Sequence, residues 1–305
     1  MKGFDTYQYV EGEVMTERDR QEVGSKFWNQ GKWDNFVKPF LPKDASDMTL
    51  VDMGCNAGIF LKLAEDMGFK RVIGVDSSKE AIRKGIAYRE RNGGKYELIR
   101  KDMTKCIDEL PMTDYTVLAM AHYYFPINDW LDYMDKIWSK SRYVIIVTAL
   151  KKSRPCKASA DTIDIRNYFK NWEEVGYIPE LPLEGDPFPR RQWSFCFKNP
   201  VLDRVPIEEI NLSNKVQVGF YGQLDKKINV YKTKYYRVIK AYRKNWSQDR
   251  KTRFIAERVD LYADIKKNGL LRPIIIAPTT RVIDGNHRLE MLRHLGEKTV
   301  IIRRA

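Results

Sequence analysis

The feature that most constrains this chain is an alternation of short apolar segments with amphipathic ones, beginning at residue 49. Apolar segments of the kind that form buried strands occupy residues 49–54, 71–76, 96–102, 116–121 and 143–149. Segments with helical apolar spacing lie between them, at residues 58–68, 77–93 and 129–140. Strands joined by helices require crossover connections, so this region is predicted to form a parallel sheet covered by helices on both faces.

The end of this region follows a different pattern. Residues 191–199 alternate apolar and polar side chains, which predicts an antiparallel strand paired with a short strand near Tyr177. A further helix is predicted over residues 161–172. The fold class expected for this part is α/β, a Rossmann-like doubly wound sheet that ends in an antiparallel hairpin.

Length and charge point to a second unit. A chain of 305 residues exceeds the ~250–300 residues at which single cores stop growing. Residues 206–305 carry 22 Lys and Arg against 10 Asp and Glu, whereas the first 205 residues carry 32 against 31. We therefore expect one domain over residues 1–200, a linker over 201–215 and a smaller, basic α+β domain over 216–305. The basic domain is suited to a phosphate or polyanion, although solvated helix faces give the same composition.

The turn after the first strand has the character of a ligand-binding loop. Gly54 and Gly58 allow the backbone to turn tightly and approach a ligand, and the following helix begins with free N–H groups. Asp76 ends the second strand, where a carboxylate accepts hydrogen bonds from both hydroxyls of a ribose. Asp102 ends the third strand and can reach an adenine amine, while Met103 packs on the ring.

These residues resemble motifs I, II and III of the class I S-adenosylmethionine-dependent methyltransferases, in the right order and spacing. The resemblance covers residues 1–200 and rests on VDMGCNAGIF, GVDSS and RKDM. It implies that S-adenosylmethionine is the cofactor, bound by these residues: Asp52, Gly54, Cys55, Asn56, Gly58, Asp76, Ser77, Asp102 and Met103. NAD is the alternative cofactor, but it usually requires a third glycine where this chain has bulky residues at 59–61.

The acceptor pocket is expected after the fourth strand, in MAHYYFP. His122 is the candidate general base and Tyr123 lines the pocket, although a lone histidine beside aromatic residues is often only packed there. The segment lacks the NPPY-like tetrapeptide of nucleic-acid amino methyltransferases. Cys156 follows a proline, as the nucleophile of cytosine C5 enzymes does, but it comes after the fifth strand, so we interpret it as structural.

The C-terminal region resembles the ParB/sulfiredoxin superfamily. A helix, an apolar strand at residues 273–278, a short hairpin and the sequence DGNHR follow in that family's order over residues 216–305. The resemblance implies a phosphate or nucleotide site, with ATP as one possible ligand, formed by Asp284, Gly285, Asn286, His287 and Arg288. No cysteine lies near this loop, which argues against sulfiredoxin-type reductase chemistry.

Together these patterns predict a methyltransferase whose basic domain binds a nucleotide, a nucleic acid or a phosphorylated acceptor. Two alternatives remain open, a bifunctional small-molecule or sugar kinase and methyltransferase, and a nucleic-acid-binding regulator that only senses the cofactor. No apolar run approaches the ~20 residues of a membrane span, and we expect a cytoplasmic protein. The four scattered cysteines show no metal-ligand spacing and are expected to be reduced core residues.

Overall fold

The computed structural model describes residues 26–149, 165–181, 192–210 and 219–305. Its residues group into two compact units. Unit 1 contains the described residues up to Asp108 and those from Thr113 to Pro200, and unit 2 contains Glu109–Met112 and Val201–Ala305. We describe the units separately. Cys156 and residues 161–164 of the helix expected over 161–172 lie outside the described residues, and the described part of that segment is helical only over Ile165–Tyr168.

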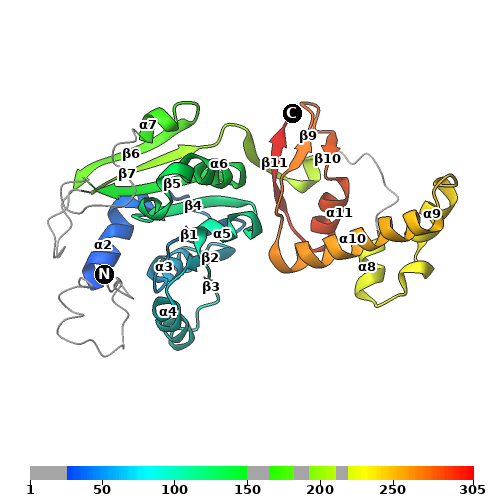
Figure 1. Cartoon of the computed structure of the whole chain (residues 1–305), viewed down its shortest axis with the longest axis horizontal. Helices are drawn as coiled ribbons and strands as arrows, with labels where there is room; N and C mark the ends of the chain where they lie inside the picture. Colours follow the sequence, from blue (N-terminus) through cyan, green and yellow to red (C-terminus); the bar gives the residue numbers. More distant parts are fainter. Residues whose placement is uncertain (1–25, 150–164, 182–191, 211–218) are drawn as a thin grey trace. The chain divides into compact units, whose positions relative to one another are not determined.

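Unit 1 is built on a seven-stranded sheet in the order β3-β2-β1-β4-β5-β7-β6 (Figure 1). Its strands are β1 (Thr49–Met53), β2 (Arg71–Asp76), β3 (Glu97–Arg100), β4 (Thr113–Ala119), β5 (Ser141–Ala149), β6 (Glu173–Leu181) and β7 (Gln192–Lys198). The first five run parallel, and β7 pairs antiparallel with both β5 and β6. The predicted parallel sheet and its antiparallel end, with a partner strand around Tyr177, are confirmed.

Helices lie before, between and after the parallel strands of unit 1. They are α2 (Lys26–Phe36), α3 (Ile59–Asp66), α4 (Lys79–Arg91), α5 (Met103–Cys106), α6 (Trp130–Lys140) and α7 (Ile165–Tyr168), with short 3-10 turns at Lys38–Phe40, Ile107–Glu109, His122–Tyr124 and Ile127–Asp129. Ser78 caps α4 by accepting a hydrogen bond from the Ala81 N–H at 3.1 Å. The apolar side of α3 is buried through Phe60, Leu61 and Ala64, which fixes how the loop before it approaches the sheet.

The strand order creates a topological switch point at β1. This strand pairs with β2 on one side and with β4 on the other, so the chain leaves β1 and β4 in opposite directions along the sheet. In such sheets the loops at the carboxyl ends of the strands diverge and leave a crevice for a ligand. The loops after β1, β2, β3 and β4 all lie at this edge, which is where the sequence places the candidate cofactor residues.

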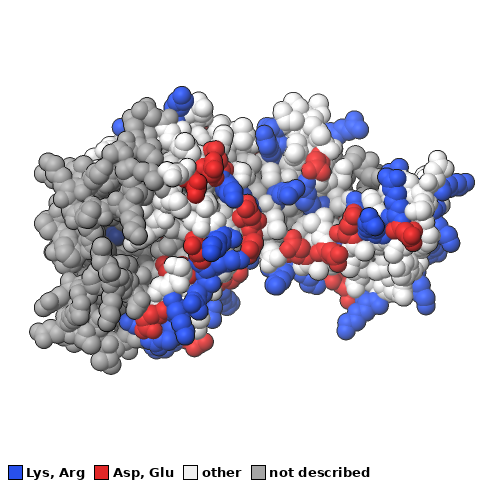
Figure 2. Space-filling view, viewed as in Figure 1, with Lys and Arg blue, Asp and Glu red and all other residues white. Residues whose placement is uncertain are grey.

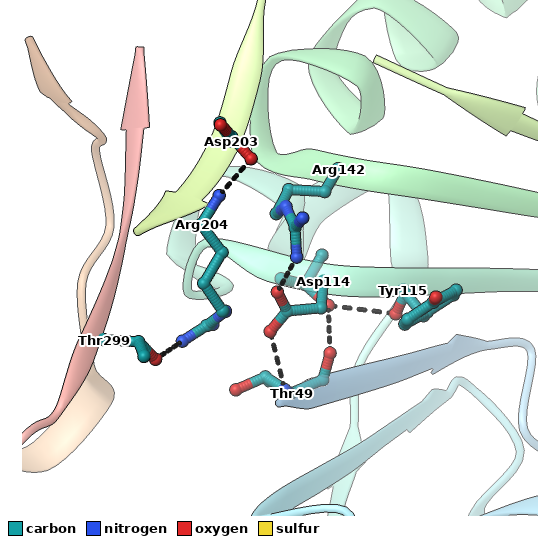
Figure 3. Close-up of polar contacts among 8 residues, drawn as sticks. Thr49, Asp114, Tyr115, Arg142, Asp203, Arg204 and Thr299 are labelled. Atoms are coloured by element: carbon teal, nitrogen blue, oxygen red, sulfur yellow. Dashed lines mark hydrogen bonds and ion pairs between the residues drawn. The ribbon is translucent and has the colours of Figure 1, made fainter. Parts of the chain in front are cut away.

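The opposite edge of the unit 1 sheet holds a buried ion pair (Figure 3). Asp114 at the start of β4 is fully buried and lies 2.8 Å from the Arg142 guanidinium on β5. The second oxygen of Asp114 accepts the Thr49 N–H on β1 at 2.9 Å. These contacts tie together the amino ends of three neighbouring strands, so their role is structural.

Unit 2 is a four-stranded sheet with helices, in the order β10-β9-β11-β8 (Figure 1). Its elements are β8 (Leu202–Pro206), α8 (Phe220–Asp225), α9 (Lys234–Tyr242), α10 (Gln248–Asn268), β9 (Ile274–Ile276), β10 (Val282–Asp284), α11 (Asn286–His294) and β11 (Thr299–Arg304), with 3-10 turns at Ile207–Glu209 and Val230–Lys232. The helix, strand, hairpin and helix expected between residues 256 and 296 are present.

The expectation of a linker over residues 201–215 is wrong for its first part. Leu202–Pro206 forms β8, which pairs antiparallel with β11 at the end of the chain. Leu202, Val205, Ile207 and Ile210 are buried in the core of unit 2. The prolines and charges of this segment do not prevent strand formation, because β8 is an edge strand, which tolerates both. The remaining residues of the expected linker, 211–215, lie outside the described residues.

Among the described residues, no helix is long and apolar enough to cross a membrane. Three of the four cysteines, Cys55, Cys106 and Cys196, are buried in the core, as expected.

Candidate cofactor site and the second glycine loop

The loop between β1 and α3 is held in a tight, strained conformation. Gly54, Asn56 and Gly58 all have positive φ angles of 79°, 51° and 78°. The N–H groups of Gly54 and Cys55 donate to the Val75 carbonyl on β2, at 2.8 and 3.0 Å. A Cβ added to Gly54 would lie 2.7 Å from the Cβ of Ala121, so only glycine lets the loop pack against the end of β4.

The carboxylate of Asp76 fastens β2 to this loop. One of its oxygens accepts the Asn56 N–H at 2.8 Å, and the other accepts the Ser78 N–H at 2.8 Å. Each carboxylate oxygen has a second lone pair that can accept a further hydrogen bond. Because Asp76 is only half-buried, its carboxylate is fixed in position and still reachable by a ligand. Ser77 is exposed in the same turn.

Asp52 is a buried acid directly before the loop. Its side chain is 2% exposed, and burial together with the negative charge of Asp76 raises its pKa to about 7. The charge of Lys32, a buried lysine on α2, opposes this rise in the pKa of Asp52. A carboxylate in this setting gains stability from any cation placed beside it.

Lys32 is a member of the site that the sequence interpretation missed. Its signal was available, because Lys32 directly precedes Trp33 on the apolar side of α2, where a charge requires a partner. Trp33 itself packs on Phe60 of α3, with ring centroids 5.4 Å apart.

The side chain of Cys55 points into the core, as expected for the cysteines. It is fully buried, and the Cβ that Gly74 lacks would lie 2.7 Å from its sulfur. Burial and the negative charges of Asp52 and Asp76 raise the pKa of the Cys55 thiol well above its usual range. The residue is therefore an inert core thiol, and only its backbone shapes the loop. Asn56 folds its side chain back, its oxygen accepting the Ala57 N–H at 2.9 Å.

Asp102 and Met103 follow β3 at the same edge of the sheet. Asp102 is exposed and caps α5, accepting the Thr104 N–H at 2.9 Å and the Thr104 hydroxyl at 2.7 Å. Both bonds go to the same oxygen of Asp102. Met103 is half-buried at the first position of the helix. The cap fixes the direction in which both side chains leave the sheet.

His122 is placed beside the loop but in the core. It lies in the 3-10 turn after β4, is fully buried, and has its Nε2 3.4 Å from the Thr148 hydroxyl on β5. Within the part of the chain that the structure describes, its Nδ1 has no hydrogen-bond partner. Burial lowers the pKa of His122 to about 3, so the ring is neutral and a weak base. A general-base role for His122 therefore stays a prediction, and it would require the ring to become more basic than it is in this conformation.

Tyr123 is half-buried, and its hydroxyl also hydrogen-bonds to Thr148. Its ring lies against His122, with centroids 4.0 Å apart. Thr148, which the sequence interpretation missed, therefore links both candidate acceptor-side residues to β5. Thr148 lies in the strongly apolar segment of residues 143–149, which the sequence analysis interprets only as a buried strand.

The DGNHR loop of unit 2 also joins a strand to a helix through a glycine. Gly285 has a φ of 101°, and a Cβ there would lie 2.8 Å from Ile274. Asp284 forms an ion pair with Arg288 at 2.6 Å, and Arg288 also donates to the carbonyls of Arg272 and Pro273. The two charged side chains of the expected phosphate site are thus paired with each other.

His287, the third expected side chain of this site, is held between two tyrosines. Its Nδ1 lies 3.1 Å from the Tyr221 hydroxyl, and its Nε2 lies 3.2 Å from the Tyr235 hydroxyl. Burial and the nearby charge of Arg258 lower its pKa to about 4. Asn286 is half-buried at the start of α11. No group of His, Cys, Asp and Glu residues within the described ranges has the arrangement of a metal site.

A family comparison accounts for the geometry of unit 1. Residues 27–180, just over half of the chain, match the model of a methyltransferase domain family. The chain belongs to this family. Residues 27–180 accordingly form a methyltransferase domain, with the Rossmann-like fold that the sheet order shows.

Individual relatives match smaller parts of the chain. The ribosomal protein L11 methyltransferase of Colwellia psychrerythraea strain 34H is 43% identical over 49 residues, which is 16% of this chain and 17% of the relative. The chain therefore matches well under a fifth of that relative's length.

Among solved structures, magnesium protoporphyrin IX methyltransferase (ChlM) from Synechocystis PCC 6803 is 15% identical with a TM-score of 0.45, covering 61% of this chain and 86% of that one. The bifunctional kinase-methyltransferase WbdD is 19% identical with a TM-score of 0.44, covering 67% and 45%. TehB from Haemophilus influenzae is 16% identical with a TM-score of 0.43, covering 50% and 58%. Similarity at this level does not identify an acceptor for this chain.

Proposed function

We propose that S-adenosylmethionine binds at the carboxyl edge of the unit 1 sheet, on the residues that the sequence motifs select. Asp52, Gly54, Asn56 and Gly58 hold its methionine end, Asp76 with Ser77 holds the ribose, and Asp102 with Met103 flanks the adenine. The observation that carries this assignment is the Asp76 carboxylate, fixed by two backbone amides beside the glycine loop.

The charge at Asp52 fits a positively charged ligand. Its pKa of about 7 reflects a carboxylate that is short of positive neighbours, since Lys32 offsets only part of the effect of burial and of Asp76. The cofactor, when bound, supplies an ammonium group and a methyl group carried on a positively charged sulfur. Asp52 would hold the ammonium and, in its presence, stay ionised at neutral pH.

Alignment is the main task of the protein in this chemistry. A sulfonium is a good leaving group, so the protein needs to align the acceptor and exclude water more than it needs acid–base groups. His122, Tyr123 and Thr148 suit this role, because hydrogen bonds link them beside the loop, with His122 and Thr148 buried behind the half-buried Tyr123. We assign them to positioning of the acceptor side rather than to proton transfer.

For unit 2 we propose recognition of an anionic acceptor: a nucleotide, a nucleic acid or another phosphorylated molecule, with ATP among the candidates. Its resemblance to ParB/sulfiredoxin proteins and its basic composition support this role. At the DGNHR loop a phosphate would have to displace Asp284 from Arg288, because the two are already paired. The kinase alternative has less support, since His287 is held on both nitrogens by tyrosine hydroxyls.

The cofactor assignment is tested by calorimetric titration of S-adenosylmethionine into the Asp76→Ala variant. Loss of charge-assisted hydrogen bonds should weaken binding by about 1–3 kcal/mol. Asp108→Ala is the matched control, because Asp108 is an exposed aspartate of unit 1 paired only at the surface with Lys136. Unchanged affinity in Asp76→Ala, with the control also unchanged, would refute the assignment.

A further inference from the structure

One stretch of unit 2 gathers most of the chain's excess positive charge. Residues 226–253 contain 11 Lys and Arg and a single acidic residue, Asp249. They begin directly after α8 and include the whole of α9 and the first residues of α10. Figure 2 shows Lys and Arg side chains around this end of unit 2. We call residues 226–253 the basic surface.

The cations of the basic surface are not neutralised by the fold. Ten of them are exposed: Lys226, Lys227, Lys232, Lys234, Arg237, Lys240, Arg243, Lys244, Arg250 and Arg253. Among the residues that the structure describes, none of these ten forms an ion pair with a carboxylate. Cations further along α10 are paired, Arg258 with Glu257 at 2.9 Å and Lys266 with Asp225 at 3.1 Å. Gathered, unpaired like charges repel one another, and a polyanion would relieve that repulsion.

Aromatic rings stand out among these cations. Tyr242 at the end of α9 is 82% exposed, and Tyr231 is 52% exposed. Trp246 has Arg243 and Arg250 over its ring, at 5.1 and 4.4 Å from the centroid. The edge-on ring of Phe254 packs against Trp246 at 5.2 Å. Exposed aromatic rings beside guanidinium groups provide the stacking platforms on which unpaired bases lie.

The orientation of α9 distinguishes between two polyanionic partners. A helix that binds an anionic membrane needs an apolar face free to enter the lipid. The apolar face of α9, formed by Tyr235, Tyr236 and Ile239, is buried in the core of unit 2. Its outward face carries cations that include Lys234, Arg237 and Lys240. The basic surface therefore presents cations and separate aromatic rings, but α9 has no exposed apolar face. This combination favours a nucleic acid over a membrane as the partner.

We propose that the basic surface binds single-stranded nucleic acid, with its phosphates on the exposed cations and its bases on the exposed rings of Tyr242 and Tyr231. The inference rests on the proposed function, because it names the class of acceptor that unit 2 would present for methylation. It uses α9 and the start of α10, and not the DGNHR loop.

The test is fluorescence anisotropy of the full chain with labelled 20-nucleotide oligomers of RNA and of DNA, each single-stranded and duplex, and with vesicles of anionic lipid. Single strands should bind best. If about five phosphates are neutralised, affinity should fall about 100-fold between 50 and 200 mM salt. Stronger binding to duplexes, binding to vesicles alone, or affinity independent of salt would overturn the proposal. The RNA and DNA arms identify which nucleic acid is bound.

Variants place the interaction on this surface. The double variant Arg237→Glu with Lys240→Glu should lose at least tenfold in affinity, whereas Lys298→Glu with Arg303→Glu, the same charge change at exposed positions elsewhere in unit 2, should lose much less. Equal losses in the two double variants would refute the location. Tyr242→Ala removes a ring that the fold leaves exposed and should weaken binding about 5- to 150-fold.

A calorimetric titration with S-adenosylmethionine separates this inference from the proposed cofactor site. All of these variants should bind the cofactor as the unaltered chain does, because their substitutions lie outside unit 1. Oligomer binding lost with cofactor binding intact is the expected result. Normal cofactor binding by a chain that binds no oligomer would leave the cofactor site standing and refute this inference alone.

Discussion

Unit 1 and unit 2 each contain a strand that ends in a glycine turn and opens a helix, and the two turns differ in what their charges do. In unit 1, Asp52 and Asp76 lie near one another, and the fold supplies too little positive charge to stabilise Asp52 as an anion. In unit 2, Asp284 is paired with Arg288, and both ring nitrogens of His287 contact tyrosine hydroxyls. Both turns have the same local backbone feature, a glycine with a positive φ angle just before a helix.

The difference shows that a glycine turn before a helix is not sufficient to indicate a ligand site. What matters is whether the charged groups around it are already satisfied by the protein. The unit 1 turn retains an electrostatic deficit that a cationic ligand would remove. The charged side chains Asp284 and Arg288 of the unit 2 turn are paired with each other, and among the described residues of that unit most of the excess positive charge lies on residues 226–253.

Of the stability changes predicted here, the largest should come from replacing Asp52, because ionising this buried carboxylate should destabilise the folded protein. Folding raises the pKa of Asp52 from 3.8 to about 7, so its contribution to stability is fully present below about pH 4 and is lost as pH rises through 7. Asp52→Asn should therefore raise the free energy of unfolding at pH 8 by up to about 4 kcal/mol.

Urea unfolding at pH 4 and pH 8 checks this prediction for Asp52. The variant should gain stability over the unaltered chain at pH 8 and gain little at pH 4. It should also bind S-adenosylmethionine more weakly, because the amide carries no charge. An equal effect of pH on both proteins would show that Asp52 carries no such deficit.

The next largest effect should come from His287, with the opposite sign. Burial lowers its pKa from 6.5 to about 4, so its contribution to stability is present above pH 6.5 and is lost as pH falls through 4. Between these values unit 2 should lose up to about 3 kcal/mol of stability through this histidine.

His287→Gln isolates that contribution, because glutamine keeps hydrogen-bonding groups beside Tyr221 and Tyr235 but does not titrate. Its acid sensitivity, measured by thermal unfolding at pH 6.5 and pH 4, should be smaller than that of the unaltered chain. His122 also resists protonation, but it is present in both proteins and cancels. Identical acid sensitivity would mean that His287 is not held neutral.

The smallest effect on stability should come from Asp284, whose side chain is 65% exposed. Asp284→Asn should cost at most about 1 kcal/mol, because surface ion pairs contribute little and Arg288 keeps its two carbonyl partners. The variant should, however, bind inorganic phosphate or ATP more tightly, since it frees the Arg288 guanidinium from its carboxylate.

Calorimetry with phosphate and ATP measures that gain, and Arg288→Gln serves as the control that should bind neither. If Asp284→Asn bound these anions no better than the unaltered chain, the DGNHR loop would not be a phosphate site. In that case only the glycine turn of unit 1 would remain a candidate ligand site.

Local patterns predicted most of the unit 1 fold and the positions of its candidate cofactor residues. The alternation of strands and helices specified a parallel sheet, and its hairpin end was legible in residues 191–199. β8 was missed because its sequence resembles a linker, and only its pairing with β11, nearly 100 residues away, makes it a strand. The pairing of two strands that lie so far apart in the sequence cannot be predicted from the residues within either strand.

The sequence by itself determined where the backbone turns tightly, at Gly54, Gly58 and Gly285, and that Asp76 and Asp102 stand at the ends of strands. This was possible because glycine flexibility, helix capping and apolar spacing are local properties. The tertiary structure decided which of those groups are charged and available. Whether Asp52 ionises depends on how deeply α2, α3 and the sheet bury it, and whether His122 is a base depends on the core around it. Burial and partner charges arise only when distant segments pack together. An aspartate beside a glycine turn is therefore buried with too little positive charge in unit 1 (Asp52), whereas in unit 2 it forms an ion pair with an arginine (Asp284 with Arg288).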